Sequence, residues 1–259
     1  MAFFQIGSKL FEADLVVFDK DGLLFDSQYF WKGLAECRMQ ALAEWIGPEG
    51  LAEWCRLFGI EEDQGVVHHV NSNGIFALAP PGEEVIITAA LIHKYTGKDW
   101  GESRQSSFNV FDSTDRTFDV ISALKPKPGF PDIFTRLNTA SIPFGIATSD
   151  EYERTRQSVD HFAKFADLQF VITPFDVLRG KPHTDMLDLI STRTGVTPDR
   201  ILMIGDSFAD MQMASDAGCI GIGIPDEPDM LRKMLPYASC IIESLEEIKL
   251  ITMEDGPKN

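Results

Sequence analysis

The stretch VVFDKDGLLFDS, residues 16–27, ends an apolar run at two aspartates, Asp19 and Asp21. Their i, i+2 spacing places both side chains on the same side of an extended chain. Gly22 follows directly, and a further acid, Asp26, stands near the end of the stretch. Two carboxylates at one spot repel each other unless a positive group joins them. The stretch therefore predicts a cation site where a buried strand ends.

The bulk composition excludes several classes of partner. The chain has 259 residues, of which 44% are hydrophobic, which suits one large domain or a domain carrying an insertion. Its formal net charge of −17 provides no basic face for nucleic acid and disfavours anionic membrane surfaces. We therefore expect neither a nucleic acid nor a membrane as partner. A small anionic substrate would need a metal or a few placed cations.

The predicted location is the cytoplasm. The opening MAFFQIGSKLFEADL lacks the basic n-region of a signal peptide. No uninterrupted apolar run reaches the roughly 20 residues that span a bilayer. The cysteines are scattered without a CxxC pair, which is typical of reduced thiols in a cytosolic protein.

Short apolar runs alternate with helical patterns through most of the chain. The runs occupy residues 15–18, 142–147, 170–172, 201–204 and 219–224, and helical patterns begin near residues 128, 151, 184 and 207. Continuous apolarity suits strands that are buried on both faces. The alternation predicts an α/β fold, a Rossmann-like doubly wound parallel sheet.

The alternation stops once, between about residues 27 and 125. Helix-like segments at 29–45, 50–59 and 84–97 surround a loop-rich piece, GVVHHVNSNGIFALAPPGEE. The junction LKPKPGF, with two prolines, is a plausible hinge boundary. We predict a core formed by residues 1–25 and 126–259, with a mainly helical domain, 26–125, inserted after the first strand.

The ends of the other predicted strands also carry polar groups. Thr148 and Ser149 follow one strand, Asp206 and Asp210 lie in GDSFAD after another, and Lys181 stands in RGKPHTD. Ligands of open parallel sheets bind beyond the carboxyl ends of the strands. A hard cation with oxygen ligands, most simply Mg²⁺, would join the acids, and phosphate oxygens would complete its shell. From the residues alone, we predict metal-assisted phosphoryl transfer.

Four motifs carry a family resemblance. DKDGLLFDS, IATSD, GKPHTD and GDSFAD, in this order, resemble the motifs of the haloacid dehalogenase (HAD) superfamily. The resemblance covers the whole chain. Within the superfamily, the chain is similar to the phosphatase branch that includes phosphoglycolate phosphatases and beta-phosphoglucomutases. The insertion stands at the position of that branch's helical, C1-type cap domain.

The resemblance implies a role for each matching residue. Asp19 matches the nucleophile that forms an aspartyl-phosphate, and Asp21 matches the general acid/base. Thr148, with Ser149 beside it, matches the hydroxyl position that holds the phosphoryl group. Lys181 matches the lysine that neutralises the phosphoryl charge, which lowers the electrostatic barrier to attack.

The resemblance also implies a Mg²⁺ site. Asp19 and Asp206 match direct ligands, Asp21 contributes its backbone carbonyl, and Asp210 is a ligand through water or a support. The implied activity is Mg²⁺-dependent hydrolysis of a small phosphorylated metabolite. The oligomeric state is not predicted.

Other reactions of the superfamily are the alternatives to a phosphatase. Dehalogenases and phosphonatases of the superfamily lack the second aspartate of the first motif, so Asp21 argues against both. Mutases of the beta-phosphoglucomutase kind keep both aspartates, but commonly carry Lys and Asn where this chain has Glu151 and Tyr152. A sugar phosphomutase is therefore the alternative to a phosphatase, and a non-catalytic phosphate-binding module is less favoured. Taken alone, Asp-x-Asp-Gly is often a turn, and a lysine such as Lys181 is usually solvated.

The inserted segment supplies candidate substrate contacts. His68 and His69, with Asn71 and Asn73, form a polar cluster that we place in a loop. We predict that His69 and Asn73 contact the leaving group, although paired histidines in a loop are more often solvated.

Overall fold

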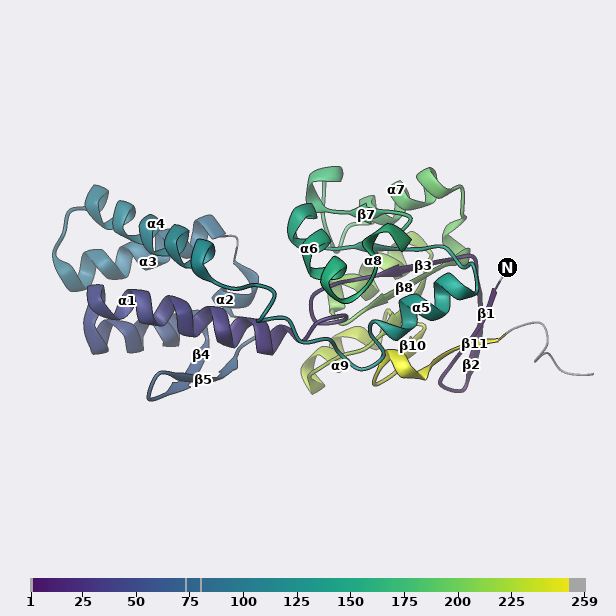
Figure 1. Ribbon diagram of the computed structural model, residues 1–259, viewed down its shortest axis with the longest axis horizontal. Coiled ribbons are helices and arrows are strands. Elements are labelled where there is room, and N and C mark those ends of the chain that lie inside the picture. Colours follow the sequence, from purple (N-terminus) through teal and green to yellow (C-terminus); the bar gives the residue numbers. More distant parts are fainter. Residues whose placement is uncertain (1, 73, 80, 252–259) are drawn as a thin grey trace, which may run out of the picture. The chain divides into compact units, whose positions relative to one another are not determined.

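The protein is described by a computed structural model covering residues 2–72, 74–79 and 81–251 (Figure 1). The chain divides into two compact units. The core unit comprises Met1–Asp26 and Pro126–Asn259, and the inserted unit comprises Ser27–Lys125. Within the described ranges, no helix is both long and apolar enough to cross a membrane.

A six-stranded sheet lies at the centre of the core unit, with strand order β10-β9-β8-β3-β6-β7. Each neighbouring pair is parallel. The strands are β3 (Leu15–Phe18), β6 (Phe144–Ala147), β7 (Val171–Ile172), β8 (Ile201–Gly205), β9 (Ile220–Gly223) and β10 (Cys240–Ile241). The apolar runs of the sequence form five of these strands; the short β10 was not predicted.

Helices cover both faces of this sheet. On one face, Val17 and Met203 pack into a buried cluster with residues of α7 and α8. On the other face, the ring of Phe18 lies 5.2 Å from that of Phe134 in α5. The helices are α5 (Asp132–Thr139), α6 (Tyr152–Phe162), α7 (Asp185–Thr194), α8 (Phe208–Ala217) and α9 (Pro228–Met234), with 3-10 turns η1 (Phe165–Asp167), η2 (Pro174–Asp176), η3 (Pro198–Arg200) and η4 (Leu245–Glu247). The predicted α/β, doubly wound fold is confirmed.

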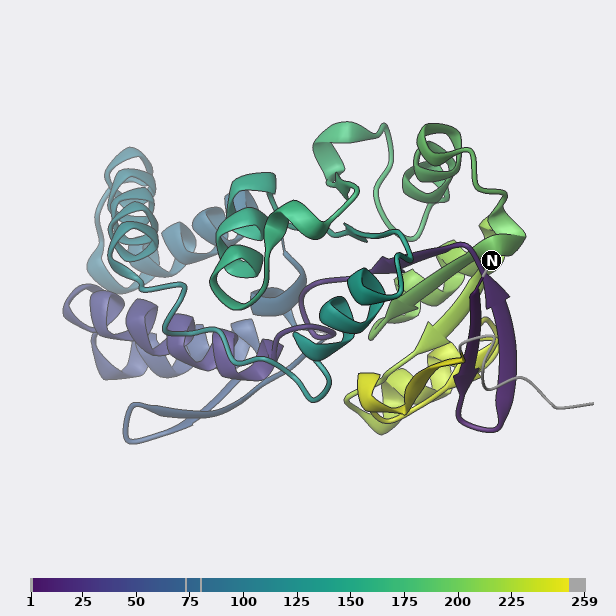
Figure 2. The same ribbon diagram turned by 45° about the vertical axis from the view of Figure 1, so that its right-hand side comes forward.

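The core unit contains a second sheet that was not predicted (Figure 2). β1 (Ala2–Ile6) pairs antiparallel with both β2 (Lys9–Ala13) and β11 (Ile248–Ile251). The insertion therefore follows the first strand of the parallel sheet, which is the third strand of the chain. β1 and β11 lie at opposite ends of the sequence, so neither displays a local pattern that reveals its partner.

The inserted unit is mainly helical. It contains α1 (Ser27–Phe58), α2 (Ile75–Leu78), α3 (Pro81–Thr96) and α4 (Trp100–Thr117). Gly47, with φ 65°, and Pro48 interrupt α1, so it consists of two helical segments, as the sequence indicated. A hairpin of β4 (Ile60–Asp63) and β5 (Val66–Val70) lies between the helices. The assignment of His68 and His69 to a loop was wrong, because both lie on β5.

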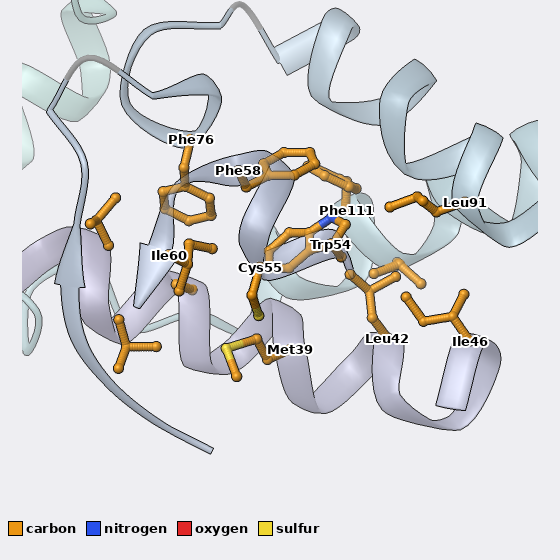
Figure 3. Packing of buried hydrophobic residues seen from close by; sticks show 14 of the residues in the cluster. Met39, Leu42, Ile46, Trp54, Cys55, Phe58, Ile60, Phe76, Leu91 and Phe111 are labelled. Carbon is orange, nitrogen blue, oxygen red and sulfur yellow. The ribbon is translucent and has the colours of Figure 1, made fainter. Parts of the chain in front are cut away.

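The inserted unit has a hydrophobic core of its own (Figure 3). Trp54 is fully buried and stacks on Phe58 with 4.5 Å between ring centroids. Its indole nitrogen donates a hydrogen bond to Thr88 Oγ1 at 3.0 Å, so burial leaves this polar atom satisfied. An ion pair between Arg38 and Glu84, both almost completely buried, joins α1 to α3.

Candidate active site

Two adjacent strands bring the predicted acids together. β3 and β8 pair in register, with Phe18 opposite Ile204. The backbone nitrogen of Asp19 donates to the carbonyl of Ile204 at 2.9 Å, which continues the pairing by one residue. Asp19 and Asp206 therefore leave the carboxyl edge of the sheet side by side.

Lys181 lies against two of these acids. Its Nζ is 2.6 Å from Oδ1 of Asp19 and 2.6 Å from Oδ1 of Asp210. The lysine side chain is only 5% exposed, and the Asp210 side chain is fully buried. The structure thus brings Lys181 into the acid cluster rather than leaving it on the surface.

Three carboxylates form a group suited to a metal ion. Asp19, Asp206 and Asp210 each offer an oxygen atom, and these oxygens lie within 4.8 Å of one another. Oδ1 of Asp206 is buried and has no hydrogen-bond partner among the described residues. A buried carboxylate oxygen without a partner is costly, and hard oxygen donors suit Mg²⁺. The arrangement fits the cation predicted from the sequence.

The pKa shifts of the clustered residues also indicate that the site favours a positive charge. Burial raises the pKa of Asp19 to about 6, although the ammonium of Lys181 acts in the opposite direction. Burial and the nearby Asp19 and Asp210 raise the pKa of Asp206 well above its usual value. Burial disfavours the charged form of Lys181, but Asp19 and Asp210 outweigh it and raise the pKa of the lysine. A bound cation would favour the ionised carboxylates.

Glycines allow the loops to approach these acids. Gly22 has φ +83°, and a Cβ atom there would lie 1.9 Å from Oδ2 of Asp206. A Cβ at Gly205 would lie 2.4 Å from the side chain of Asp210. The glycine of the first motif is therefore required both by its backbone conformation and by the Asp206 carboxylate against it.

Asp210 also fixes the start of α8. Its Oδ2 accepts hydrogen bonds from the Ser207 hydroxyl at 2.6 Å and from the Ser207 backbone nitrogen at 3.2 Å. The second of these bonds forms a capping box with the bond that the Asp210 backbone nitrogen donates to Ser207 Oγ at 3.3 Å. Its other oxygen faces Lys181. Asp210 thus orients the lysine and the helix together.

Thr148 and Ser149 follow β6 and differ in exposure. Thr148 is 1% exposed, and its hydroxyl oxygen accepts a hydrogen bond from the backbone nitrogen of Asp150 at 3.1 Å. This leaves the hydroxyl hydrogen available to a ligand oxygen. Ser149 is exposed. Its hydroxyl has no described protein partner that would fix it at the site.

Comparison with known proteins assigns the family. The chain matches the haloacid dehalogenase-like hydrolases over residues 13–218, which contain all four motifs. It belongs to this family of hydrolases. The predicted resemblance is therefore confirmed, and so is its consequence that the chain is an enzyme of this family.

Individual relatives extend the comparison. The hydrolase is 25% identical over 221 residues to a phosphoglycolate phosphatase of Salmonella typhi, covering 81% of this chain and 80% of the relative. A HAD-superfamily hydrolase of Geobacter sulfurreducens has a similar structure, with TM-score 0.58, 19% identity, and 91% and 94% of the two chains covered. A Thermotoga maritima protein proposed to be a beta-phosphoglucomutase matches with TM-score 0.59, 18% identity, and coverage of 90% and 95%.

Two residues beside the site of this hydrolase, Lys20 and Asp150, were not predicted from the sequence. Lys20 is 2% exposed, and its Nζ lies 2.5 Å from Oδ1 of Asp21 and 2.9 Å from Oδ2 of Asp150. Burial disfavours the ammonium, but the two carboxylates outweigh it and raise the pKa of Lys20. The available signal was a lysine between the two aspartates of the first motif, shortly after an apolar strand.

Among the candidate substrate contacts of the inserted unit, the two histidines differ in exposure. His68 is exposed and His69 half-buried, and successive residues of a strand point to opposite faces. The two histidines therefore do not form the paired cluster predicted from the sequence. Asn73 lies outside the described residues, and the role of His69 stays a prediction.

Proposed function

We propose that this hydrolase is a phosphatase that cleaves a small organic phosphate monoester, with Mg²⁺ as cofactor. The observation that carries the proposal is the buried Asp19–Lys181 pair beside the Asp206 oxygen that lacks a hydrogen-bond partner in the described part of the chain. A cationic side chain beside a nucleophilic carboxylate, with space for a second cation, suits a phosphoryl group. The relationship to a phosphoglycolate phosphatase supports the same reaction class.

In the proposed reaction, an Asp19 oxygen attacks phosphorus and the bond from phosphorus to the leaving oxygen breaks. Asp21 acts as the general acid and gives a proton to that oxygen as the alcohol departs. Asp21 then takes a proton from water, whose oxygen attacks the phosphorus of the aspartyl-phosphate and releases inorganic phosphate. Lys181 and the Thr148 hydroxyl would hold the phosphoryl oxygens throughout.

Asp19, Asp206 and the backbone carbonyl of Asp21 would hold the Mg²⁺, with Asp210 in support. When bound, Mg²⁺ would neutralise part of the charge on the carboxylates and on the phosphoryl oxygens. Without such a cation, Lys181 beside Asp19 and Lys127 near Asp206 would have to offset the negative charge of the carboxylates and of the phosphoryl group.

The experiment is a phosphate-release assay over a panel of phosphorylated metabolites that begins with 2-phosphoglycolate. We expect Mg²⁺-dependent release that excess EDTA abolishes and that Asp19→Asn, purified identically, does not show. Full activity in EDTA would overturn the metal assignment. Lack of turnover of every ester, 4-nitrophenyl phosphate included, would favour a non-catalytic module.

The mutase remains the alternative reaction, and the same panel tests it. Its support is the likeness to the Thermotoga maritima protein, which at 18% identity shows the fold alone. A mutase would convert a sugar 1-phosphate into its 6-phosphate with little release of inorganic phosphate. Product analysis by phosphorus NMR distinguishes the two outcomes.

A further inference from the structure

Lys20 stands between the two acids of the first motif, yet it is buried. Only 2% of it is exposed, and its Nζ lies 2.5 Å from Asp21 and 2.9 Å from Asp150. With its ammonium buried between two carboxylates, Lys20 is poorly placed to bind a phosphoryl group itself. It acts through the carboxylates that it contacts.

Lys20 bridges Asp21 and Asp150, and Asp150 is the fixed end of this bridge. Its side chain is 11% exposed, and its Oδ1 accepts a hydrogen bond from the backbone nitrogen of Glu151 at 2.8 Å. The same oxygen lies 3.3 Å from Arg154. The backbone nitrogen of Asp150 donates to Thr148 Oγ1 at 3.1 Å, so Asp150 also fixes the hydroxyl proposed to hold the phosphoryl group.

Asp21 is the more exposed end of the bridge. Its side chain is 50% exposed, and Lys20 is the one side-chain partner of its carboxylate among the described residues. A half-exposed acid has several accessible rotamers, and fixing one of them costs conformational entropy. A buried ammonium anchored by Asp150 reduces that cost at the moment of proton transfer.

We propose that Lys20 is a positioning residue that orients the Asp21 carboxyl for proton transfer, with Asp150 as its anchor. The proposal rests on the phosphatase function above and deepens it. β3 and β6 are hydrogen-bonded neighbours, so the Lys20–Asp150 contact joins the loops that follow two adjacent strands. It couples the proposed proton donor to the loop that carries Thr148.

The effect of losing the orientation of Asp21 depends on the leaving group of the substrate. An alkoxide needs a proton as its bond to phosphorus breaks, whereas 2,4-dinitrophenolate departs readily without one. Loss of Asp21 orientation should therefore slow the first step for an alkyl phosphate and spare it for 2,4-dinitrophenyl phosphate. The parameter kcat/KM isolates this step, because it reports on events up to formation of the aspartyl-phosphate.

The test compares Lys20→Met with wild type on 2,4-dinitrophenyl phosphate and on the best alkyl phosphate of the panel. We expect kcat/KM for the alkyl ester to fall by about 10–100-fold, within the range of general acid catalysis, and that for the aryl ester to change by less than about threefold. Lys249→Met, which removes an exposed lysine of β11 in the same unit, should change neither.

A second variant covers the case in which Lys20→Met does not fold. Asp150→Asn keeps the shape of the anchor, removes its charge, and should produce the same selective loss to a smaller extent. Equal losses on both esters in a folded variant, or no loss on either, would overturn the positioning role alone. Absence of wild-type activity on both esters would instead overturn the phosphatase function on which it rests.

Discussion

Lys181 Nζ lies 2.6 Å from Oδ1 of Asp19, although 162 positions separate the two residues in the chain. The lysine follows β7 and the aspartate directly follows β3, and β6 lies between these strands in the sheet. The contact therefore depends on the loop after β7 returning to the carboxyl edge of β3. It places a positive charge against the carboxylate that we propose attacks phosphorus.

Asp19→Asn should abolish phosphate release while the protein remains folded. Asparagine keeps the shape of the side chain but lacks the charged oxygen that attacks phosphorus, so we expect a loss of roughly 10³-fold or more. Steady-state kinetics and circular dichroism measure the two properties. Asp216→Asn, on the exposed side of α8, is the matched control and should retain full activity. Substantial turnover by Asp19→Asn would remove Asp19 from this role.

Lys181→Ala should reduce kcat by about 10²–10³-fold, the loss expected when one preorganised stabilising charge is removed. Lys181→Arg should restore little, because the larger, planar guanidinium does not fit the position of an ammonium that lies 2.6 Å from both Asp19 and Asp210. Near wild-type kcat in Lys181→Ala would show that another cation neutralises the phosphoryl group.

Gly22→Ala should weaken Mg²⁺ binding by about 10–100-fold, the usual effect of disturbing the support of a metal ligand. The added Cβ would lie 1.9 Å from Oδ2 of Asp206, and the residue has φ +83°, so the carboxylate must move. Isothermal titration with Mg²⁺ measures the change. Gly180→Ala is the control, since a Cβ there meets no atom within 4 Å. Equal affinities in wild type and Gly22→Ala would separate Asp206 from the metal site.

Arg38→Met should destabilise the inserted unit by about 3–5 kcal/mol, because Glu84 would keep a buried charge without its main partner. The guanidinium of Arg38 also lies 4.3 Å from the ring centroid of Phe111, a contact that the apolar methionine retains in part. The double variant Arg38→Met/Glu84→Leu should recover most of the loss. Urea unfolding followed by tryptophan fluorescence measures all three proteins. A double variant no more stable than Arg38→Met would contradict this explanation.

His69→Ala should change the relative kcat/KM values of different metabolites while sparing 4-nitrophenyl phosphate. In the proposed function, the core motifs recognise the phosphoryl group and the metal, so we expect discrimination among organic groups to come from other residues. His68→Ala, which alters the neighbouring exposed residue on β5, is the matched control. A uniform change over all substrates would remove His69 from substrate selection.

The sequence by itself determined the parallel sheet and the acids at its edge. Leu15–Phe18 and Ile201–Gly205 are continuous apolar runs, and such runs predict strands because both faces of a parallel sheet are covered. Asp19 and Asp206 follow those runs directly and Asp21 comes two positions after Asp19, so the local pattern also predicts their place at the carboxyl edge.

Contacts between residues that lie far apart in the sequence were decided only by the tertiary structure. The pairing of β1 with β11 joins the two ends of the chain, and the burial of Lys20 against Asp150 joins two loops. The strand that carries His69, β5, was taken for part of a loop because it is short and two histidines interrupt its apolar residues. Local periodicity shows which face of an element is apolar, but it does not show which distant residue covers that face or which countercharge meets a buried ion. The covering residue and the countercharge are set by long-range packing, because a buried charge is stable only when another part of the chain supplies its partner.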